Sequence, residues 1–229
     1  MKITCILASY NRPQMIQDAL ASVAEQTHKD YELLVYDDSN AFDVREAVKK
    51  FQFTSVQVSH SDLTPQQRRH RCRLGVNCNA GLKIATGDVI TFLCDDDFYY
   101  PTWFASVSAF FEANPGKNVA YGRLWYLSSK KKVFPTGGRG LFPGGVIEDP
   151  YEKLDHNQVA HRRMTPPVKW PEEFEKCGAP DGLYFRRIAQ AGNKFFPIPA
   201  DAVVKRWHKK NLQTTMKEIG TDLGEGLRE

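Results

Sequence analysis

The sequence lacks any long apolar run. No window reaches the roughly 18 apolar residues that a membrane-spanning helix requires. The apolar stretch near the start, within MKITCILASYN, is too short for the hydrophobic region of a signal peptide. We therefore expect no membrane span and a cytoplasmic location.

Cysteine is scarce and does not occur in pairs. The five residues are Cys5, Cys72, Cys78, Cys94 and Cys177, an odd number without regular spacing. This pattern favours free thiols in a reducing compartment over a disulfide framework. Cys72 and Cys78 are too far apart for the usual zinc-binding pair, so we expect them to be buried as small apolar residues.

A strong excess of one charge is also missing. Against 27 acidic residues stand 31 lysines and arginines, a net charge of +4. A nucleic-acid-binding protein usually presents a denser basic face. The basic stretch QQRRHRCR at 66–73 and the lysines at 130–132 leave two interpretations open: a solvated surface, or contact with an anionic acceptor such as modified nucleic acid or a lipid phosphate.

The 229 residues suit one domain, and 41% of them are hydrophobic, enough for a sizeable core. Apolar runs predict strands at 3–9, 31–36, 55–59 and 89–93, with an extended segment at 118–127 and a further strand at 159–164. Helical spacing predicts helices from Pro13 to Val23 and at 41–51, 74–85, 103–114 and 182–191. Segment 130–150 predicts a loop or hairpin. The alternation over the first half indicates an α/β fold with a mainly parallel, twisted sheet flanked by helices.

Three polar clusters follow predicted strands directly: 9–12, 37–39 and 95–97. In parallel sheets, ligands bind beyond the carboxyl ends of the strands. The run Asp95, Asp96 and Asp97 is the most informative cluster, because adjacent carboxylates repel one another. A divalent cation with a preference for oxygen ligands, Mn²⁺ or Mg²⁺, would relieve that repulsion. The alternative is a solvated acidic turn.

Four blocks carry a resemblance to a known family. They are ASYNRPQMIQDALASVAEQTHKDYELLVYDDSN, RLGVNCNAGLKIATGDVITFLCDDDFYYP, LDHNQVAHRR and PDGLYFRRIAQAG, in order between residues 3 and 208. Together they resemble family 2 glycosyltransferases of the GT-A fold, and most of all the branch that makes spore coat polysaccharide. The resemblance implies one continuous domain, with a nucleotide-sugar-binding half at 1–127 and an acceptor-binding half at 128–229.

The resemblance also implies a nucleobase pocket. Carried over by position, Ala8 and Tyr10 line this pocket, and the Tyr10 ring stacks on the base. Asp38 accepts a hydrogen bond from the base, and Arg73 lies beside the base or the phosphates. Arg12 belongs to the same donor site.

For the diphosphate, the resemblance implies a cation site at the acidic cluster. Asp97 is the expected metal ligand, and Asp96 holds the ribose hydroxyls, with Asp95 in the same donor site. His208 matches a late histidine that supports the metal or phosphates in some relatives. Many relatives begin this motif with aspartate where this chain has Cys94. We do not expect Cys94 to be a nucleophile, since no basic partner is visible and nearby carboxylates should raise the pKa of its thiol.

On the acceptor side, the resemblance implies that Asp181 is the general base that deprotonates the acceptor hydroxyl. The usual preceding acidic residue is Pro180 here, and Asp181 could alternatively cap the helix that follows. His156 and Asn157 line the acceptor side, whereas His161 serves packing or surface contacts.

The resulting expectation is an inverting, metal-dependent transfer of sugar from a UDP- or dTDP-sugar to a hydroxyl-bearing saccharide or glycoconjugate. A nucleotidylyltransferase is disfavoured, because ASYNRPQM lacks the glycine-rich loop that such enzymes carry after the first strand. A non-catalytic nucleotide-sugar- or polysaccharide-binding module of the same fold is the other alternative.

Overall fold

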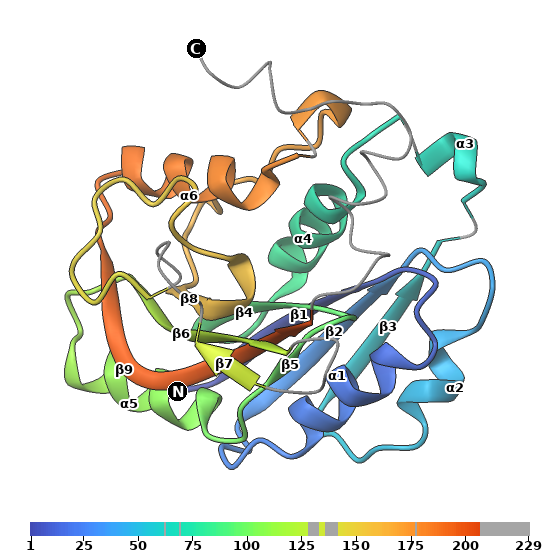
Figure 1. Cartoon of the computed structure of the whole chain (residues 1–229), viewed down its shortest axis with the longest axis horizontal. Helices are drawn as coiled ribbons and strands as arrows, with labels where there is room; N and C mark the ends of the chain where they lie inside the picture. Colours follow the sequence, from blue (N-terminus) through green and yellow to red (C-terminus); the bar gives the residue numbers. More distant parts are fainter. Residues whose placement is uncertain (62, 69, 128–132, 136–141, 177, 207–229) are drawn as a thin grey trace.

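The computed structural model describes residues 1–61, 63–68, 70–127, 133–135, 142–176 and 178–206 (Figure 1). Its strands are β1 (Ile3–Ser9), β2 (Tyr31–Asp37), β3 (Val56–His60), β4 (Val89–Cys94), β5 (Phe98–Tyr99), β6 (Val119–Leu127), β7 (Val133–Pro135), β8 (Val159–Arg162) and β9 (Phe195–Arg206). Its helices are α1 (Met15–Ala24), α2 (Val44–Val48), α3 (Pro65–Arg68), α4 (Arg73–Ile84), α5 (Trp103–Ala113) and α6 (Pro180–Gln190), with short 3₁₀ turns η1 (His156–Gln158) and η2 (Phe174–Lys176).

Within the described residues, the strands form one sheet in the order β3-β2-β1-β4-β8-β6-β9-β5, and β7 pairs with β6. The first four strands in this order are parallel. Their register sets Ala8 beside Tyr36 on one side and Cys94 on the other, so β1, β2 and β4 end at the same edge. This confirms the parallel first half. The second half is mixed, because β8 runs antiparallel to β4 and β6, while β9 runs parallel to β6.

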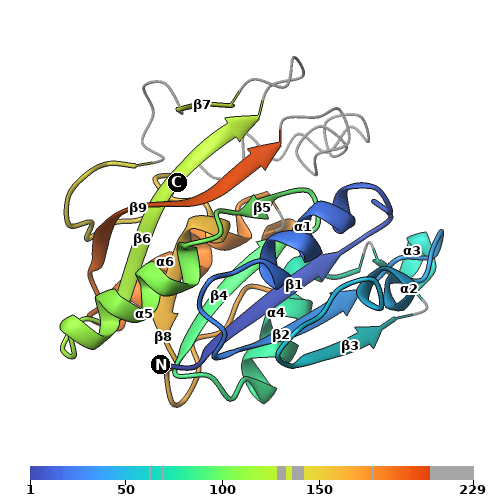
Figure 2. The ribbon, with the colours of Figure 1, turned by 90° about the horizontal axis from the view of Figure 1, so that it is seen from below.

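Two hydrophobic layers sandwich the sheet. Apolar residues of β1 such as Ile3 and Leu7 pack with α1, α2 and α5 on one face. Ile6, which points to the opposite face, packs with α4 and α6. Figure 2 shows α1 and α2 together on the near side of β1 and β2. The central strands are therefore buried on both faces, which explains their continuous apolar runs.

Some predicted boundaries were wrong. The helix expected at 41–51 is limited to Val44–Val48, because Asp43 caps its start by accepting a hydrogen bond from the Arg45 backbone N–H. Strand β8 ends at Arg162, two residues early. The predicted hairpin at 130–150 is partly described: β7 pairs antiparallel with β6, and the rest up to residue 141 lies outside the described residues.

Strand β9 was not predicted. Pro197 and Pro199 interrupt its apolar pattern, and proline cannot donate to a strand ladder. Its register with β6 shifts between Tyr121 and Leu124, close to these prolines. The consequence for the site is large, because the end of β9 carries Lys205 and Arg206 to the edge where β1 and β4 also end.

Candidate active site

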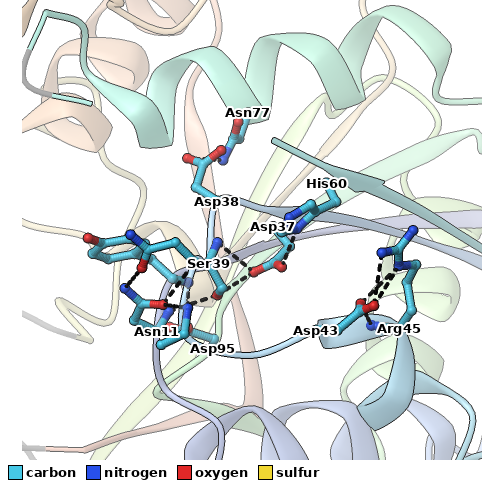
Figure 3. A network of polar contacts seen from close by, with 12 residues as sticks. Asn11, Asp37, Asp38, Ser39, Asp43, Arg45, His60, Asn77 and Asp95 are labelled. Carbon is cyan, nitrogen blue, oxygen red and sulfur yellow. Dashed lines mark hydrogen bonds and ion pairs between the residues drawn. The ribbon is translucent and has the colours of Figure 1, made fainter. Parts of the chain in front are cut away.

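The three polar clusters that follow β1, β2 and β4 meet, as expected. The backbone N–H of Tyr10 donates to Asp95 Oδ2 at 2.8 Å, joining the first cluster to the third. The backbone N–H of Asn11 donates to Ser39 Oγ at 2.8 Å, joining the first to the second (Figure 3). The parallel register is what brings these residues, up to 85 positions apart, to one place.

Asn11 fixes the loop after β1. Its φ of 51° is in the left-handed region, which asparagine tolerates better than most residues. Its side-chain Oδ1 accepts the backbone N–H groups of Asn40 and Ala41, both at 3.0 Å. Sequence reasoning missed this clamp, although an asparagine after a strand end is a usable signal.

Asp38 is surrounded by cations. Arg73 donates to both of its carboxylate oxygens, Nε to Oδ2 at 2.9 Å and NH2 to Oδ1 at 2.8 Å. Asn77 Nδ2 and Arg68 NH1 also reach Oδ2, at 3.1 and 2.9 Å. Burial alone would raise the pKa of Asp38, but the hydrogen bonds and charges of Arg73 and Arg68 outweigh it and lower that pKa. Figure 3 shows Asp38 turned toward Asn77.

Tyr10 follows the end of β1, where Ala8 also lies, and its backbone N–H is bonded to Asp95. The guanidinium carbon of Arg68 lies 3.4 Å from the centre of the Tyr10 ring. Arg68 also lies 2.9 Å from Asp38 Oδ2, so it links Tyr10 to Asp38 and turns inward rather than lying on a solvated basic surface. Arg71, from the same basic stretch, forms an ion pair with Glu172.

Asp95 is buried and paired with Arg12, whose NH1 lies 2.6 Å from Asp95 Oδ1. Arg12 NH2 also lies 3.4 Å from Asp96 Oδ2. Burial and the repulsion of Asp96 outweigh the attraction of Arg12, and together they raise the pKa of Asp95 to about 6. Asp95 thus orders the loop after β1, while the Asp96 side chain retains 14% exposure.

Asp97 is almost fully buried, with 2% exposure. Asn157 Nδ2 donates to its Oδ2 at 2.8 Å, and the backbone N–H of Arg206 donates to its Oδ1 at 2.8 Å. Each oxygen keeps a further lone pair. Burial and the neighbouring charge of Asp96 raise the pKa of Asp97 well above its ordinary value.

Lys205 and Asp155 form an ion pair next to Asp97, in which Asp155 is buried and the Lys205 side chain is 27% exposed. Asp155 Oδ2 contacts the Lys205 ammonium, and Asp155 Oδ1 accepts both the backbone and side-chain N–H of Asn157. Burial would raise the pKa of Asp155, but Lys205 lowers it below the ordinary range. Burial would lower the pKa of Lys205, and the charges of Asp155 and Asp97 raise it instead. Lys205 was not predicted, since it lies on the strand that the prolines obscured.

Asp181 lies in the first turn of α6, 24% exposed. It is not the N-cap: that position is Ala179, and Pro180 occupies the first helical position, where its missing N–H has no intrahelical partner to lose. His156 Nδ1 lies 3.5 Å from Asp181 Oδ2. On the other side of its ring, His156 Nε2 lies 3.1 Å from Cys94 Sγ.

The Cys94–His156 contact corrects one sequence-based argument, which held that Cys94 has no basic partner. The partner exists, yet burial and the charges of Asp96 and Asp97 still raise the pKa of the thiol well above its ordinary value. A reactive thiolate is therefore not favoured.

The remaining predicted residues are one asparagine and three histidines. Asn157 and His156 lie between the acidic cluster and Asp181, in η1. His161 has a packing role: its Nε2 lies 2.8 Å from the Tyr184 hydroxyl, and burial lowers its pKa to about 4. His208 lies outside the described residues.

Two donor sets could hold a cation here. The carboxylates of Asp96 and Asp97 offer hard oxygen ligands, which suit Mg²⁺ or Mn²⁺. A second set, Asp155, His156 and Asp181, has ligand atoms within 4.8 Å of one another. In that second set, however, Asp155 already binds Lys205 and Asn157, so the Asp96–Asp97 set fits an added cation better.

A shallow cavity of about 560 Å³ opens beside the Asp38 pocket. It is lined by residues of the β2–α2 loop, from Ser39 to Asp43, together with Arg45, His60, Leu63 and Thr64. His60 is fixed by Asp37, whose Oδ2 lies 2.8 Å from its Nδ1. In the described part of the chain, no helix is both long and apolar enough to cross a bilayer.

Comparisons with known proteins agree with this geometry. The family model described as glycosyl transferase family 2 matches residues 4–164. The chain is similar to Protein CgeD of Bacillus subtilis (strain 168), with 26% identity over 98% of this chain and 54% of that protein. The chain thus spans about half the length of CgeD.

Solved structures share the fold. The structure of S. aureus TarS 1-349 in complex with UDP-GlcNAc is similar at a TM-score of 0.70, with 18% identity over 94% of this chain and 61% of that one. The mannosyltransferase PcManGT from Pyrobaculum calidifontis, in complex with GDP-Man and Mn²⁺, is similar at a TM-score of 0.64, with 16% identity over 91% of this chain and 58% of that one.

Proposed function

Because the chain belongs to glycosyl transferase family 2, we propose that it is an inverting, metal-dependent glycosyltransferase that uses a UDP- or dTDP-sugar. One observation carries this proposal. Asp97 accepts hydrogen bonds from Arg206 at the end of β9 and from Asn157 in η1, and His156 of the same turn η1 contacts Asp181. One carboxylate set suits a diphosphate-bound cation, and a separate carboxylate suits an acceptor hydroxyl.

The nucleobase pocket is proposed at Tyr10 and Asp38. A base stacked on the Tyr10 ring would lie next to an ionised carboxylate that can accept its N–H, as a uracil or thymine ring requires. Arg73 holds that carboxylate by two hydrogen bonds, so its position is fixed before a nucleotide binds. Support for the donor class comes from TarS, whose structure contains UDP-GlcNAc.

The cation is proposed at Asp97, with Asp96 beside it for the ribose, and the buried donor set fits Mn²⁺ or Mg²⁺. When bound, the cation would neutralise the leaving diphosphate. Arg12 and Asn157 orient the two ends of the acidic cluster, and Lys205 adds a positive charge on its inner side. PcManGT, whose structure contains Mn²⁺, supports the choice of metal.

Asp181 is proposed as the general base. It is exposed enough to meet an acceptor hydroxyl, and His156 lies against its Oδ2. The acceptor is proposed to be a saccharide or glycoconjugate. A nucleic-acid acceptor is less well supported, because Arg68, Arg71 and Arg73 each pair with a carboxylate and do not form an open basic face.

A donor screen tests this proposal. Thermal unfolding is followed with UDP-, dTDP- and GDP-sugars, each with Mn²⁺ or with EDTA, because a ligand that binds only the folded state raises the unfolding temperature. We expect a UDP- or dTDP-sugar to stabilise in Mn²⁺ only, and slow donor hydrolysis to accompany binding. Stabilisation without any hydrolysis or transfer would instead indicate a non-catalytic binding module.

A further inference from the structure

Arg68 contacts both groups that a nucleobase would need in the proposed pocket, the face of the Tyr10 ring and the Asp38 carboxylate. Its guanidinium carbon is 3.4 Å from the centre of the Tyr10 ring, which is the contact distance of two stacked planar groups, about 3.5 Å. Its NH1 is also 2.9 Å from Asp38 Oδ2. The side chain is only 16% exposed, so it is inserted into the pocket rather than lying over its rim.

Asp38 Oδ2 is crowded by this arrangement. It faces Arg73 Nε, Asn77 Nδ2 and Arg68 NH1 at 2.9, 3.1 and 2.9 Å. A carboxylate oxygen accepts about two hydrogen bonds with good geometry, so a base N–H would have to replace one of the three. Arg73 and Asn77 come from α4, whereas Arg68 is the last residue of the four-residue helix α3.

We propose that Arg68 occupies the place of the nucleobase in the nucleotide-free protein, and that the donor nucleotide binds by displacing it. This inference rests on the proposed function, because it needs the base to bind at Tyr10 and Asp38. A nucleobase and a guanidinium present the same elements here: a flat face for the Tyr10 ring and an N–H for the carboxylate.

The displacement is structurally inexpensive. Helix α3 is a single turn, and Gln66 and Gln67 beside Arg68 are exposed, so α3 can shift with little loss of its own packing. The contacts that the Arg68 side chain gives up at Tyr10 and Asp38 are taken over by the nucleobase. Asp38 keeps its two hydrogen bonds to Arg73 and the one to Asn77, which preserves the pocket. Only a fraction of the nucleotide-free molecules then has Arg68 out of the pocket and can bind nucleotide. The apparent affinity for nucleotide is reduced by that fraction.

Removal of an arginine from a nucleotide-binding site usually weakens binding, but we expect removal of Arg68 to strengthen it. Removing a direct ligand contact weakens binding, but removing a group that competes with the ligand strengthens it. Arg68→Ala should therefore bind UDP about three- to tenfold more tightly than the wild type. Arg68→Lys keeps the charge toward Asp38 but loses the flat group that lies on Tyr10. Its affinity for UDP should therefore lie between those of the wild type and Arg68→Ala.

The test is calorimetric titration of UDP, with Mn²⁺ present, into the full chain and four variants: Arg68→Ala, Arg68→Lys, Arg71→Ala and Tyr10→Ala. Arg71→Ala is the matched control, since Arg71 lies on the same stretch but pairs with Glu172, and its affinity should equal that of the wild type. A lower or unchanged affinity for both Arg68→Ala and Arg68→Lys would overturn the displacement.

Tyr10→Ala separates this inference from the proposed function. If Tyr10→Ala loses UDP binding while Arg68→Ala gains none, the pocket is correct and only the displacement is wrong. If neither the wild type nor Arg68→Ala binds UDP or dTDP, the pocket assignment and the displacement fail together.

Discussion

Asp38, just beyond β2, and Asp97, just beyond β4, are both buried carboxylates at one edge of the sheet, yet their surroundings differ in charge. Asp38 faces two arginines, and its pKa is lowered. Among the described residues, Asp97 accepts hydrogen bonds from the neutral N–H groups of Asn157 and Arg206, has Asp96 as its neighbour, and its pKa is raised.

The difference shows where the folded chain has supplied counter-charge and where it has not. Uncompensated burial of ionised carboxylates is unfavourable, so a region that keeps them is suited to an external cation. Lys205 compensates Asp155 and only partly Asp97. The charge of Asp38 is compensated by two arginines, whereas the charge of Asp97 is compensated only in part, which supports the proposed cation site there.

The largest expected effect is that of Asp97→Asn. The asparagine keeps the size of the side chain and removes its charge, so the cation loses its ligand. We expect transfer to fall about a thousandfold or more, and the Mn²⁺-dependent thermal shift with UDP to vanish. Asp88→Asn, at the opposite edge of the sheet, is the control and should behave like the wild type. A normal Mn²⁺-dependent shift in Asp97→Asn would contradict the assignment.

Asp181→Asn should affect turnover alone. Removal of a general base costs roughly 10²- to 10⁴-fold in rate. Because Asp181 is on α6, away from the nucleobase pocket at Asp38, the UDP affinity should stay within about twofold of the wild type. Single-turnover kinetics with calorimetry separate the two quantities. Normal transfer by this variant would show that another group is the base.

Lys205→Met removes the cation that lies beside Asp155 and Asp97. The variant leaves Asp155 buried without its cation, so we expect a loss of about 3 kcal/mol in the free energy of unfolding at pH 7. The same change at Arg73 should cost less, because Asp38 keeps Arg68 and Asn77. Urea unfolding of both variants, with Lys205→Arg as a charge-preserving control, measures the difference. Equal losses would remove the contrast between the two regions.

The smallest expected effect is the change in the stability of the metal-free protein with pH. The pKa of Asp95 is raised to about 6, so its folded form takes up a proton before the unfolded chain does. Its contribution to stability therefore rises as the pH falls through 6. The pKa of Asp38 is lowered, so its stabilisation is present at neutral pH and is lost in acid, as the pH falls through its lowered folded-state pKa. Carboxyl ¹³C NMR should show that Asp95 takes up its proton at a higher pH than Asp38 does; the reverse order of these two would contradict this account.

Most of the structure in residues 1–127 could be predicted from the sequence, because the signals there are local. Strands β1, β2 and β4 are buried on both faces and read as unbroken apolar runs, and parallel pairing brings their polar ends together. The placement of Asp38 and of the cluster at 95–97 at the same edge of the sheet could therefore be predicted.

The described residues after 127 were less predictable, because their contacts with the site are long-range. Lys205 and Arg206 reach the site through β9, whose pattern Pro197 and Pro199 disguise. Arg206 bonds Asp97 across 109 positions, and no local periodicity reveals such a pair. For Arg68, the sequence left both a solvated surface and contact with an anionic acceptor open, because it does not show which of several neighbouring arginines turns inward.

The central claim is that the under-compensated carboxylates beyond β4 take up the cation. Crystals soaked with Mn²⁺ and UDP, measured at the manganese absorption edge, test it most directly. The account predicts an anomalous peak in contact with the Asp97 carboxylate, next to the diphosphate. A peak confined to Asp155, His156 and Asp181, or one elsewhere on the molecule, would contradict it.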